Sequence, residues 1–320
     1  MHRSSAHAAA HAARDTALRG LLWGLLAASI WASYSVLARL GVKAGLSPAD
    51  LTLMRFLPGA LLMAPFMWRW GWRDLAGIGW GRGLILALLA GPVFSLLFMT
   101  GFSLAPLAHG AVIAPACQML AGLVLSAWFV NQPLTRESVA GAGCVLLGLG
   151  FMGGDSLLHG EGGLTLVGDA LFVAAGCCWG LFGALSRRWQ VDPLRVTGVV
   201  AVLSFLLFAP GFFAFAGVER LANASAGMLT MQLLAQGVGA GLVAMLAFSR
   251  AAALLGSGRA GFFGALVPGA ASLLAIPVLG EVPTGLQVAG IVAVVAGLLI
   301  AFGAVRYLIL RREANAQAGH

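Results

Sequence analysis

The sequence predicts an all-α integral membrane protein of ten transmembrane helices, arranged as two inverted five-helix repeats. The composition is 60% hydrophobic and 9% charged, whereas a soluble domain carries about 25% charged residues. The apolar runs are about 20 residues long, the length with which a helix crosses a hydrocarbon core of roughly 30 Å. The Val-Ala-Gly triplet at 139–141 recurs at 288–290, an offset of 288 − 139 = 149 residues, which indicates an internal repeat.

The apolar runs divide the chain in order. The ten predicted spans are 19–40, 49–68, 83–104, 108–130, 138–154, 167–187, 196–217, 232–250, 259–280 and 286–306. The expected organisation is a disordered cytoplasmic tail at 1–18, a first repeat at 19–154, an external loop at 155–166, a second repeat at 167–306 and a cytoplasmic C-terminal tail at 307–320. The first run extends beyond a usual signal-peptide core, so we expect a retained helix.

The basic residues predict the orientation. Fifteen of the 19 Lys and Arg residues fall in segments on one side of the predicted membrane, and Arg39, Lys43 and Arg220 fall on the other. By the positive-inside rule both termini are expected in the cytoplasm of a multi-pass protein of the cell inner membrane. Because five spans are an odd number, the second repeat must run upside down. Inverted repeats with a site at the midplane between them are typical of secondary transporters.

Several residues resemble those of a known family. They are Trp31 in the first span, the adjacent Arg55 and Phe56 in the second, and Pro268 followed by Gly280, Glu281 and Thr284 before the last span. At these positions the chain resembles the EamA family of the drug/metabolite transporter superfamily. The resemblance implies a basket of ten helices that exports metabolites, amino acids or toxic compounds by alternating access. It implies no enzymatic activity and no cofactor.

The first repeat departs from this pattern. Asn131 and Gln132 stand where a Gly-Glu pair is usual, and Gln118 stands where the second repeat has Pro268. The role of the family glutamate, which we expect to be structural and at a turn, therefore passes to Glu281 alone.

A central cavity is predicted from the depth of side chains in their spans. A cavity within a bilayer needs a few polar groups to orient a ligand and aromatic or thioether walls to bury it. The expected lining is Trp31, Tyr34, Arg55, Ser95, Met99, Gln118, Trp179, Gln236 and Pro268. The alternative is plain helix packing, in which these side chains fill gaps or bond to their own helix.

Arg55 is the most specific of these residues. It lies near the middle of the second span, where a charge costs at least ~2.5 kcal/mol on insertion scales and usually faces a cavity or a partner. One interpretation is contact with an anion or carboxylate, or a gate. The other is a tie to backbone carbonyls, or to Asp50 about one turn away.

Other functions are limited by what the sequence lacks. The single lysine, Lys43, follows no glycine-rich loop, so an ATP-driven pump is excluded, and no HExxH motif is present. No metal or nucleic-acid partner is expected; the partners are a small-molecule substrate and the lipid bilayer. The acidic residues lie at span edges rather than deep inside, which favours facilitated or exchange transport over a buried proton relay.

Two other functional classes stay open. An integral membrane enzyme acting on lipid would need clustered groups at one face, and Asp155, His159 and Glu161 are the only candidates, but an exposed loop is the favoured interpretation of this segment. A non-transporting scaffold or lipid translocase is the other.

Paired glycines, such as Gly176 with Gly180, are expected to pack helices within the chain, with a homodimer as the alternative.

Overall fold

The computed structural model describes residues 2–130, 134–159, 163–216, 218–255 and 257–301. Within these ranges every regular element is helical. The first repeat contains α1 (His2–Lys43), α2 (Pro48–Trp70), η1 (Leu75–Gly77), α3 (Trp80–Ala90), α4 (Pro92–Leu104), α5 (Leu107–Val130) and α6 (Arg136–His159). The second contains α7 (Leu164–Arg188), α8 (Pro193–Gly211), η2 (Phe212–Ala216), α9 (Glu219–Asn223), α10 (Ala226–Gln232), η3 (Leu233–Val243), α11 (Ala244–Leu255), α12 (Ser257–Leu279) and α13 (Gly285–Ala301).

The predicted all-α membrane class is confirmed for the described residues. Nine helical segments among them are long and apolar enough to cross a bilayer. The tenth predicted span, 286–306, overlaps the shorter apolar helix α13, and its last five residues lie outside the described ranges. The number of ten spans therefore stays a prediction. The turn at 131–133, where the first repeat departs from the family pattern, also lies outside the described residues.

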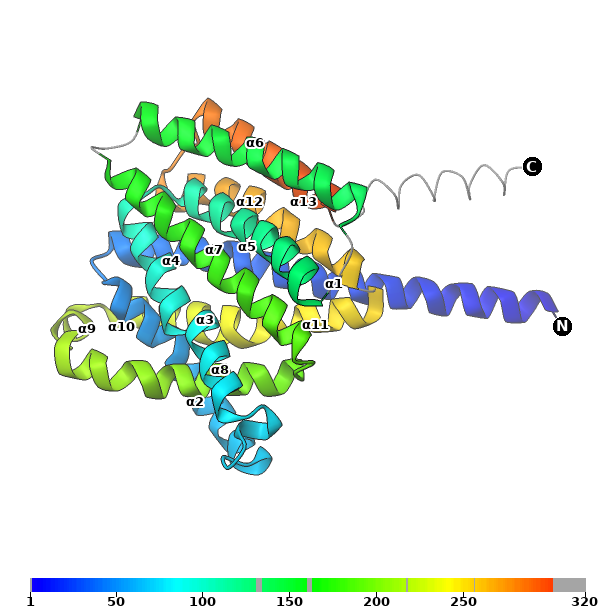
Figure 1. Cartoon of the computed structure of the whole chain (residues 1–320), viewed down its shortest axis with the longest axis horizontal. Helices are drawn as coiled ribbons and strands as arrows, with labels where there is room; N and C mark the ends of the chain where they lie inside the picture. Colours follow the sequence, from blue (N-terminus) through cyan, green and yellow to red (C-terminus); the bar gives the residue numbers. More distant parts are fainter. Residues whose placement is uncertain (1, 131–133, 160–162, 217, 256, 302–320) are drawn as a thin grey trace.

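The first helix is longer than the sequence predicts. Residues 2–18, expected as a disordered tail, form the first turns of α1, which runs from His2 to Lys43 and projects beyond the bundle in Figure 1. The segment is rich in alanine, the strongest helix former. Extending an existing helix also avoids the unfavourable nucleation step that an isolated helix must take.

The two repeats pack about an approximate two-fold axis. Helix α2 packs on its counterpart α8, and α6 packs on its counterpart α13. The contact of α1 with α12 has its equivalent in the contact of α7 with α5. Figure 1 shows α6 and α13 side by side along one edge of the bundle, with α5, α7 and α12 in the next layer. Each contact between the repeats thus has an equivalent in which the two repeats have changed roles, as expected for two related halves that face each other.

Glycines bring α6 and α13 together. A Cβ atom added at Gly148 would lie 2.9 Å from the Gly290 carbonyl oxygen, and one at Gly297 would lie 2.6 Å from the Gly141 carbonyl oxygen. The four positions are related by the repeat, because 290 − 141 and 297 − 148 both equal 149. Small residues allow helix backbones to approach this closely in a membrane protein. We call this contact the glycine seam.

The third predicted span is broken into α3 and α4. Gly91 separates them with φ −104° and ψ −124°, and Pro92 opens α4, a position at which the missing N–H of proline costs nothing. A Cβ at Gly91 would lie 2.0 Å from the Ala87 carbonyl oxygen, so only glycine fits. The prolines at 58, 65, 115 and 268 lie inside continuous helices.

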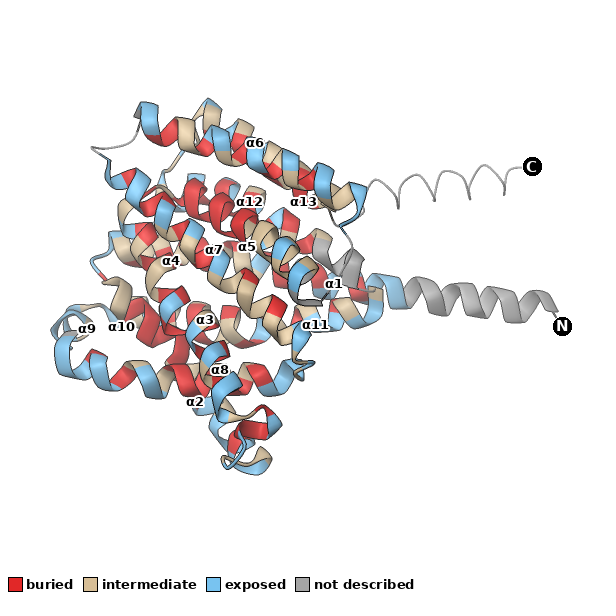
Figure 2. Ribbon diagram, in the orientation of Figure 1, coloured by how far each residue is buried: buried red, intermediate tan, exposed pale blue. Residues whose placement is uncertain are grey.

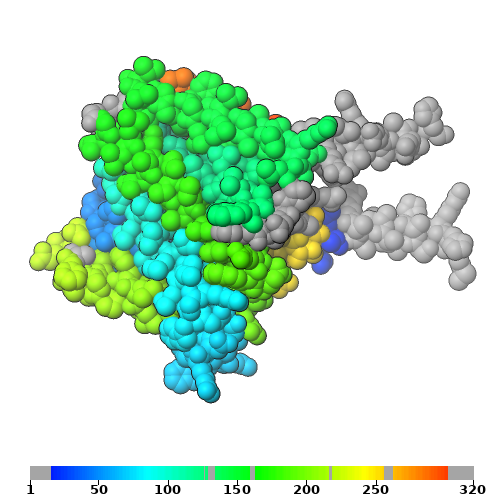
Figure 3. Space-filling model, viewed as in Figure 1, coloured from blue at the N-terminus to red at the C-terminus, as the bar shows by residue number. Residues whose placement is uncertain are grey.

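The surface suits a bilayer. Many large apolar side chains on the outer helix faces are exposed, among them Trp68, Trp128, Leu147, Phe215 and Leu273. Figure 2 shows buried residues concentrated on the inward faces of the helices and exposed ones along the outside of α6 and α8. The space-filling view in Figure 3 shows one continuous body, with the turn between α2 and α3 as a small lobe at its base.

Candidate functional site

Arg55 lies at the centre of an aromatic cluster. Its guanidinium carbon is 5.0 Å from the ring centre of Tyr34, 5.5 Å from that of Phe94 and 6.0 Å from that of Phe56. Helix α2 begins with a capping box between Ser47 and Asp50, which fixes where the helix starts. Arg55 is then seven residues into α2, about 10 Å along its axis. The buried guanidinium is thus held by ring faces, which attract cations.

The polar atoms around Arg55 are not fully paired. Arg55 Nη1, the Tyr34 hydroxyl and Gln236 Oε1 are buried and have no hydrogen-bond partner among the described residues. Leaving a buried polar atom unpaired costs about 1–3 kcal/mol, and more when the group is charged. Asp50, the alternative partner considered for Arg55, instead bonds to Ser47 and Arg220. Arg55 therefore retains a donor that can bind an anionic group.

A small cavity lies beside Arg55, between the two repeats. Its volume is about 60 Å³, and its walls come from α2, α3, α7, α8, η3 and α11. Arg55 and Ala90 belong to the first repeat, and Trp179 and Gly241 to the second. This inner cavity has room for only about two waters. Solutes bind in cavities of about 300–1,000 Å³, so a solute requires the walls to move apart.

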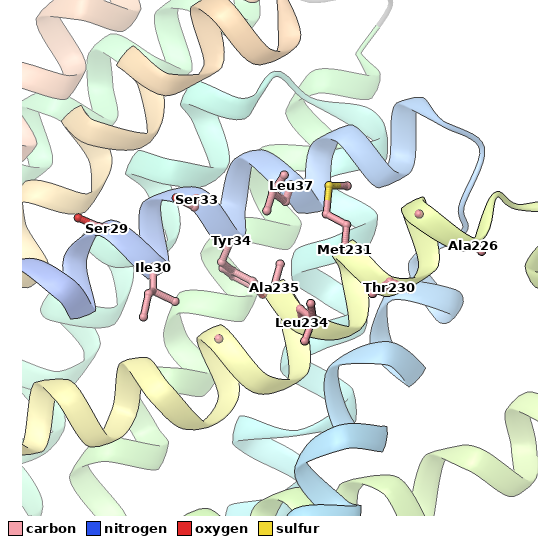
Figure 4. A pocket seen from close by; sticks show the side chains of 12 residues that line it. Ser29, Ile30, Ser33, Tyr34, Leu37, Ala226, Thr230, Met231, Leu234 and Ala235 are labelled. Carbon is pink, nitrogen blue, oxygen red and sulfur yellow. The ribbon is translucent and has the colours of Figure 1, made fainter.

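A larger groove lies on the other side of Tyr34. It has a volume of about 870 Å³ and runs between α1 and the continuous segment of α10 and η3. Figure 4 shows Tyr34 and Ile30 on α1 facing Ala235 and Leu234 on η3. Tyr34 lines this groove and also contacts Arg55, which lines the inner cavity. One aromatic ring therefore links the groove to the arginine that lines the inner cavity.

The π-helical segment η3 forms the second wall of both spaces. Gly237 in η3 packs on α2, where an added Cβ would lie 2.5 Å from Pro58 Cγ. Gln232, just before η3, donates to the Leu37 carbonyl oxygen at 2.7 Å, and Gln236 donates to Gln232 Oε1 at 2.9 Å. Wide helical turns of this kind are frequent at functional sites.

The predicted site residues do not all meet. Arg55 and Trp179 line the inner cavity, and Tyr34 lines the groove. The other six line neither space: Trp31, Ser95, Met99, Gln118, Gln236 and Pro268. Trp31 packs on Phe248, with ring centres 5.4 Å apart.

Helix rotation explains why these six are elsewhere. Ser95 and Thr52 share a hydrogen bond of 3.0 Å that joins α4 to α2. Met99 is fully buried in the apolar core, and Gln118 is exposed on α5. Depth along a span does not specify which face of the helix a side chain occupies. Their roles in substrate binding remain predictions from the sequence.

Glu281 joins three elements at one end of the bundle. Its carboxylate lies 3.0 Å from Arg39 Nε and 2.8 Å from Lys43 Nζ, and it accepts the Leu107 N–H at 2.9 Å. Burial alone raises the pKa of Glu281, but the Lys43 and Leu107 hydrogen bonds and the Arg39 charge outweigh it and hold the pKa below its usual value. Arg39 also donates to the Phe102 carbonyl oxygen. We call this the Glu281 end.

A second polar cluster at the Glu281 end was not predicted. His109 of α5 is fully buried, with Nδ1 2.8 Å from Asp169 of α7 and Nε2 3.1 Å from Asp155 of α6. The prediction that Asp155 belongs to an exposed loop cluster is wrong, because Asp155 is buried. Of its expected companions, the side chain of His159 and all of Glu161 lie outside what the structure describes.

A signal for this cluster was present in the sequence. His109, Asp155, Asp169 and Gln287 each lie near a span end, and the predicted topology brings those ends to the same side of the membrane. The expectation that acidic residues lie at span edges is met in position, but Asp155 and Asp169 are buried there rather than exposed.

Comparison with known proteins agrees with these features. A helical membrane bundle of two repeats with a cavity between them has the design of a transporter. The EamA-like transporter family matches residues 18–154 and 166–303, so this chain belongs to that family, within the drug/metabolite transporter superfamily. Family members are transporters, not enzymes.

A solved structure supports the fold. A crystal structure of a protein matches 90% of this chain and 98% of its own, with a TM-score of 0.62 and 19% sequence identity. At that identity the likeness concerns the fold alone. No curated protein matches the chain.

Proposed function

We propose that this protein is a secondary transporter that exports small organic solutes from the cell by alternating access. The observation that carries the proposal is Arg55, a buried charge with an unpaired donor next to a cavity between the two repeats. Charged side chains inside membrane-spanning segments usually mark a substrate or ion pathway. The family membership supports transport as the activity.

The site chemistry favours solutes that carry a carboxylate or another anionic group beside an apolar body. Arg55 Nη1 supplies the donor for the anion. The Tyr34 and Phe94 rings pack against the guanidinium, and Trp179, which lines the inner cavity, packs on Phe94 with ring centres 4.7 Å apart. Amino acids, other carboxylated metabolites and drug-like acids share these features.

Alternating access would use the packing between the repeats. The Glu281 end is tied by ion pairs and buried hydrogen bonds, and the inner cavity is too small for a solute. These contacts support assigning the structure, within this proposal, to a state closed at the Glu281 end. With the orientation that the basic residues predict, this is the external end, and both termini are in the cytoplasm. Rocking one repeat against the other would open the cavity to each side in turn.

A second candidate is transfer of lipid. The large groove between α1 and η3 combines the hydroxyls of Ser29, Ser33 and Thr230 with an apolar floor, which suits an amphipathic molecule. A lipid translocase would use this groove without requiring Arg55.

Ligand-induced thermal stabilisation tests the proposal. The purified protein is screened with amino acids, organic acids, purines and cationic drugs, and each hit is repeated with Arg55→Gln and with Arg69→Gln, an exposed arginine at the end of the same helix, as the control. We expect an anionic solute to raise the melting temperature of the wild type and of the control, but not of Arg55→Gln. Equal stabilisation of all three proteins would remove Arg55 from the site, and a response to phospholipid alone would favour the translocase.

A further inference from the structure

The His109 cluster holds three ionisable groups from three helices. His109 lies near the start of α5, Asp155 near the end of α6 and Asp169 near the start of α7. The imidazole is fully buried, and its two nitrogens lie 2.8 Å and 3.1 Å from oxygens of different carboxylates. The cluster is separate from Arg55 and from both cavities.

Neutral donors surround the two carboxylates. Asp155 accepts hydrogen bonds from Thr284 and from Gln287 Nε2, the latter at 2.7 Å, and Asp169 accepts one from Ser156. Further charges lie at the same end of the bundle: Glu281 binds the Leu107 N–H two residues before His109, and its partners are Arg39 and Lys43. Through Thr284 and Gln287 the cluster also holds the start of α13.

The carboxylate contacts favour two protons on the imidazole, and Gln287 Nε2, 3.1 Å from His109 Nε2, is the donor that remains when that nitrogen has no proton. Each nitrogen–oxygen contact needs a hydrogen between the two atoms, because a ring lone pair repels a carboxylate lone pair. Two contacts therefore need two protons shared by three groups. An imidazolium between two carboxylates supplies both protons. Loss of one proton makes one contact repulsive, and the buried surroundings strengthen that repulsion.

The arrangement does not suit a metal. The two ring nitrogens lie on opposite sides of the imidazole and face different carboxylates, so the three groups do not converge on one point. In the described part of the chain no group of three or more His, Cys, Asp or Glu side chains could hold a metal ion.

We propose that His109, Asp155 and Asp169 form a proton-binding site that couples proton release to opening of the Glu281 end. With the proton bound, the site joins α5, α6, α7 and α13. Without it, the repulsive contact separates α5 from α6 or from α7 and loosens that end. Asp169 provides the path for exchange with solvent, because 12% of its side-chain surface remains exposed. Only the coupling to a solute rests on the proposed transport function.

Nitrogen NMR of labelled histidine tests proton binding without any solute. The chain has six histidines, and His109→Gln assigns the resonance of interest by its disappearance. The spectra are recorded over a range of about pH 5 to 9, and we expect the His109 imidazole to lose its proton as the pH rises. Asp155→Asn and Asp169→Asn, which keep the shape of each side chain, should each move the midpoint to lower pH by about one unit or more because a neighbouring negative charge is lost. Glu219→Gln, an exposed carboxylate on α9, should leave the midpoint unchanged.

Amide hydrogen exchange tests the opening. After correction for the intrinsic pH dependence, exchange in the peptides around 155–159 and 284–290 should rise several-fold as His109 loses its proton, and the rise should follow the shifted midpoint in Asp169→Asn. An imidazole that keeps one protonation state across this range, or a midpoint insensitive to both Asn variants, would overturn the proposal. Amide exchange rates that do not change at the His109 midpoint would also overturn the proposal. None of these failures would affect the Arg55 experiment.

Discussion

The two polar regions of the bundle differ in how completely their groups are paired. At the Glu281 end each ionised group that holds helices together has charged or hydrogen-bonding partners: Glu281 has Arg39 and Lys43, and His109 has two carboxylates. At the centre, Arg55 has ring faces around it and an unpaired Nη1. Paired buried charges stabilise one conformation, whereas an unpaired donor is available to a ligand.

The largest effect is expected from His109→Leu. The substitution removes the imidazole between two buried carboxylates and leaves them facing an apolar group. Breaking a buried charge pair by removing one partner costs about 3–5 kcal/mol. Thermal or denaturant unfolding in detergent should show that loss, with Glu219→Gln as the exposed control. A loss below about 1 kcal/mol would mean that the cluster does not hold the Glu281 end.

Gly148→Ala should come next. The added Cβ would lie 2.9 Å from the Gly290 carbonyl oxygen and 2.5 Å from Val294 Cγ2, so α6 and α13 must separate. Overpacking of this kind costs about 1–3 kcal/mol. Gly150→Ala, two residues away on α6 with no atom within 4 Å of its added Cβ, is the matched control and should be neutral or slightly stabilising. Equal melting temperatures for the two variants would contradict the glycine seam.

A comparable but pH-dependent effect is expected from Glu281→Gln. Because the pKa of Glu281 is lowered by folding, its contribution to stability is complete above the unfolded value, near 4.5, and is lost as the pH falls through the lower folded value. At pH 7 the variant should lose about 1.5–3 kcal/mol, since hydrogen bonds to charged groups contribute about that much. The wild type should lose more stability than the variant on acidification from pH 7 to about pH 4. Parallel pH profiles would contradict the role of the ion pairs.

The smallest change in stability is expected from Arg55→Gln. The cation–π contacts it removes contribute about 0.5–2 kcal/mol, but removal of a buried charge offsets that loss. The net change in unfolding free energy should lie within about 1 kcal/mol, while the response to an anionic solute disappears. Strong destabilisation would place Arg55 with the paired groups and remove the contrast between the two regions.

The helices could be predicted because each is encoded locally. Within the described residues, the predicted spans fall on helical segments, the tenth of them only in part, and the family was identified from residues spread over both repeats. The break at Gly91 was not predicted, because it depends on the close approach of the Ala87 carbonyl oxygen and of Ser204 from the second repeat. Long-range packing of this kind leaves little trace in a single apolar run.

The sites were predictable only in part, for a related reason. Arg55 stands out alone because a charge in an apolar run is costly. His109 lies 46 and 60 residues from its two carboxylates, so the cluster exists only after folding. Gln118 was assigned to the cavity from its depth alone, and the structure places it on an exposed face of α5. The position of a residue within an apolar run predicts how deep its side chain lies in the membrane. The direction in which that side chain points depends on how the helix packs against its neighbours.

The glycine seam has a consequence for the history of the chain. Gly141 meets Gly297 and Gly148 meets Gly290, so each position contacts the counterpart of the other. That reciprocity is the mark of an isologous interface, the kind formed by two identical subunits. A polypeptide of only one repeat would already present the surface that a second copy of itself needs. In the fused chain, a larger side chain on one side of this surface requires a compensating change on the other side. The two halves therefore cannot diverge independently at these positions.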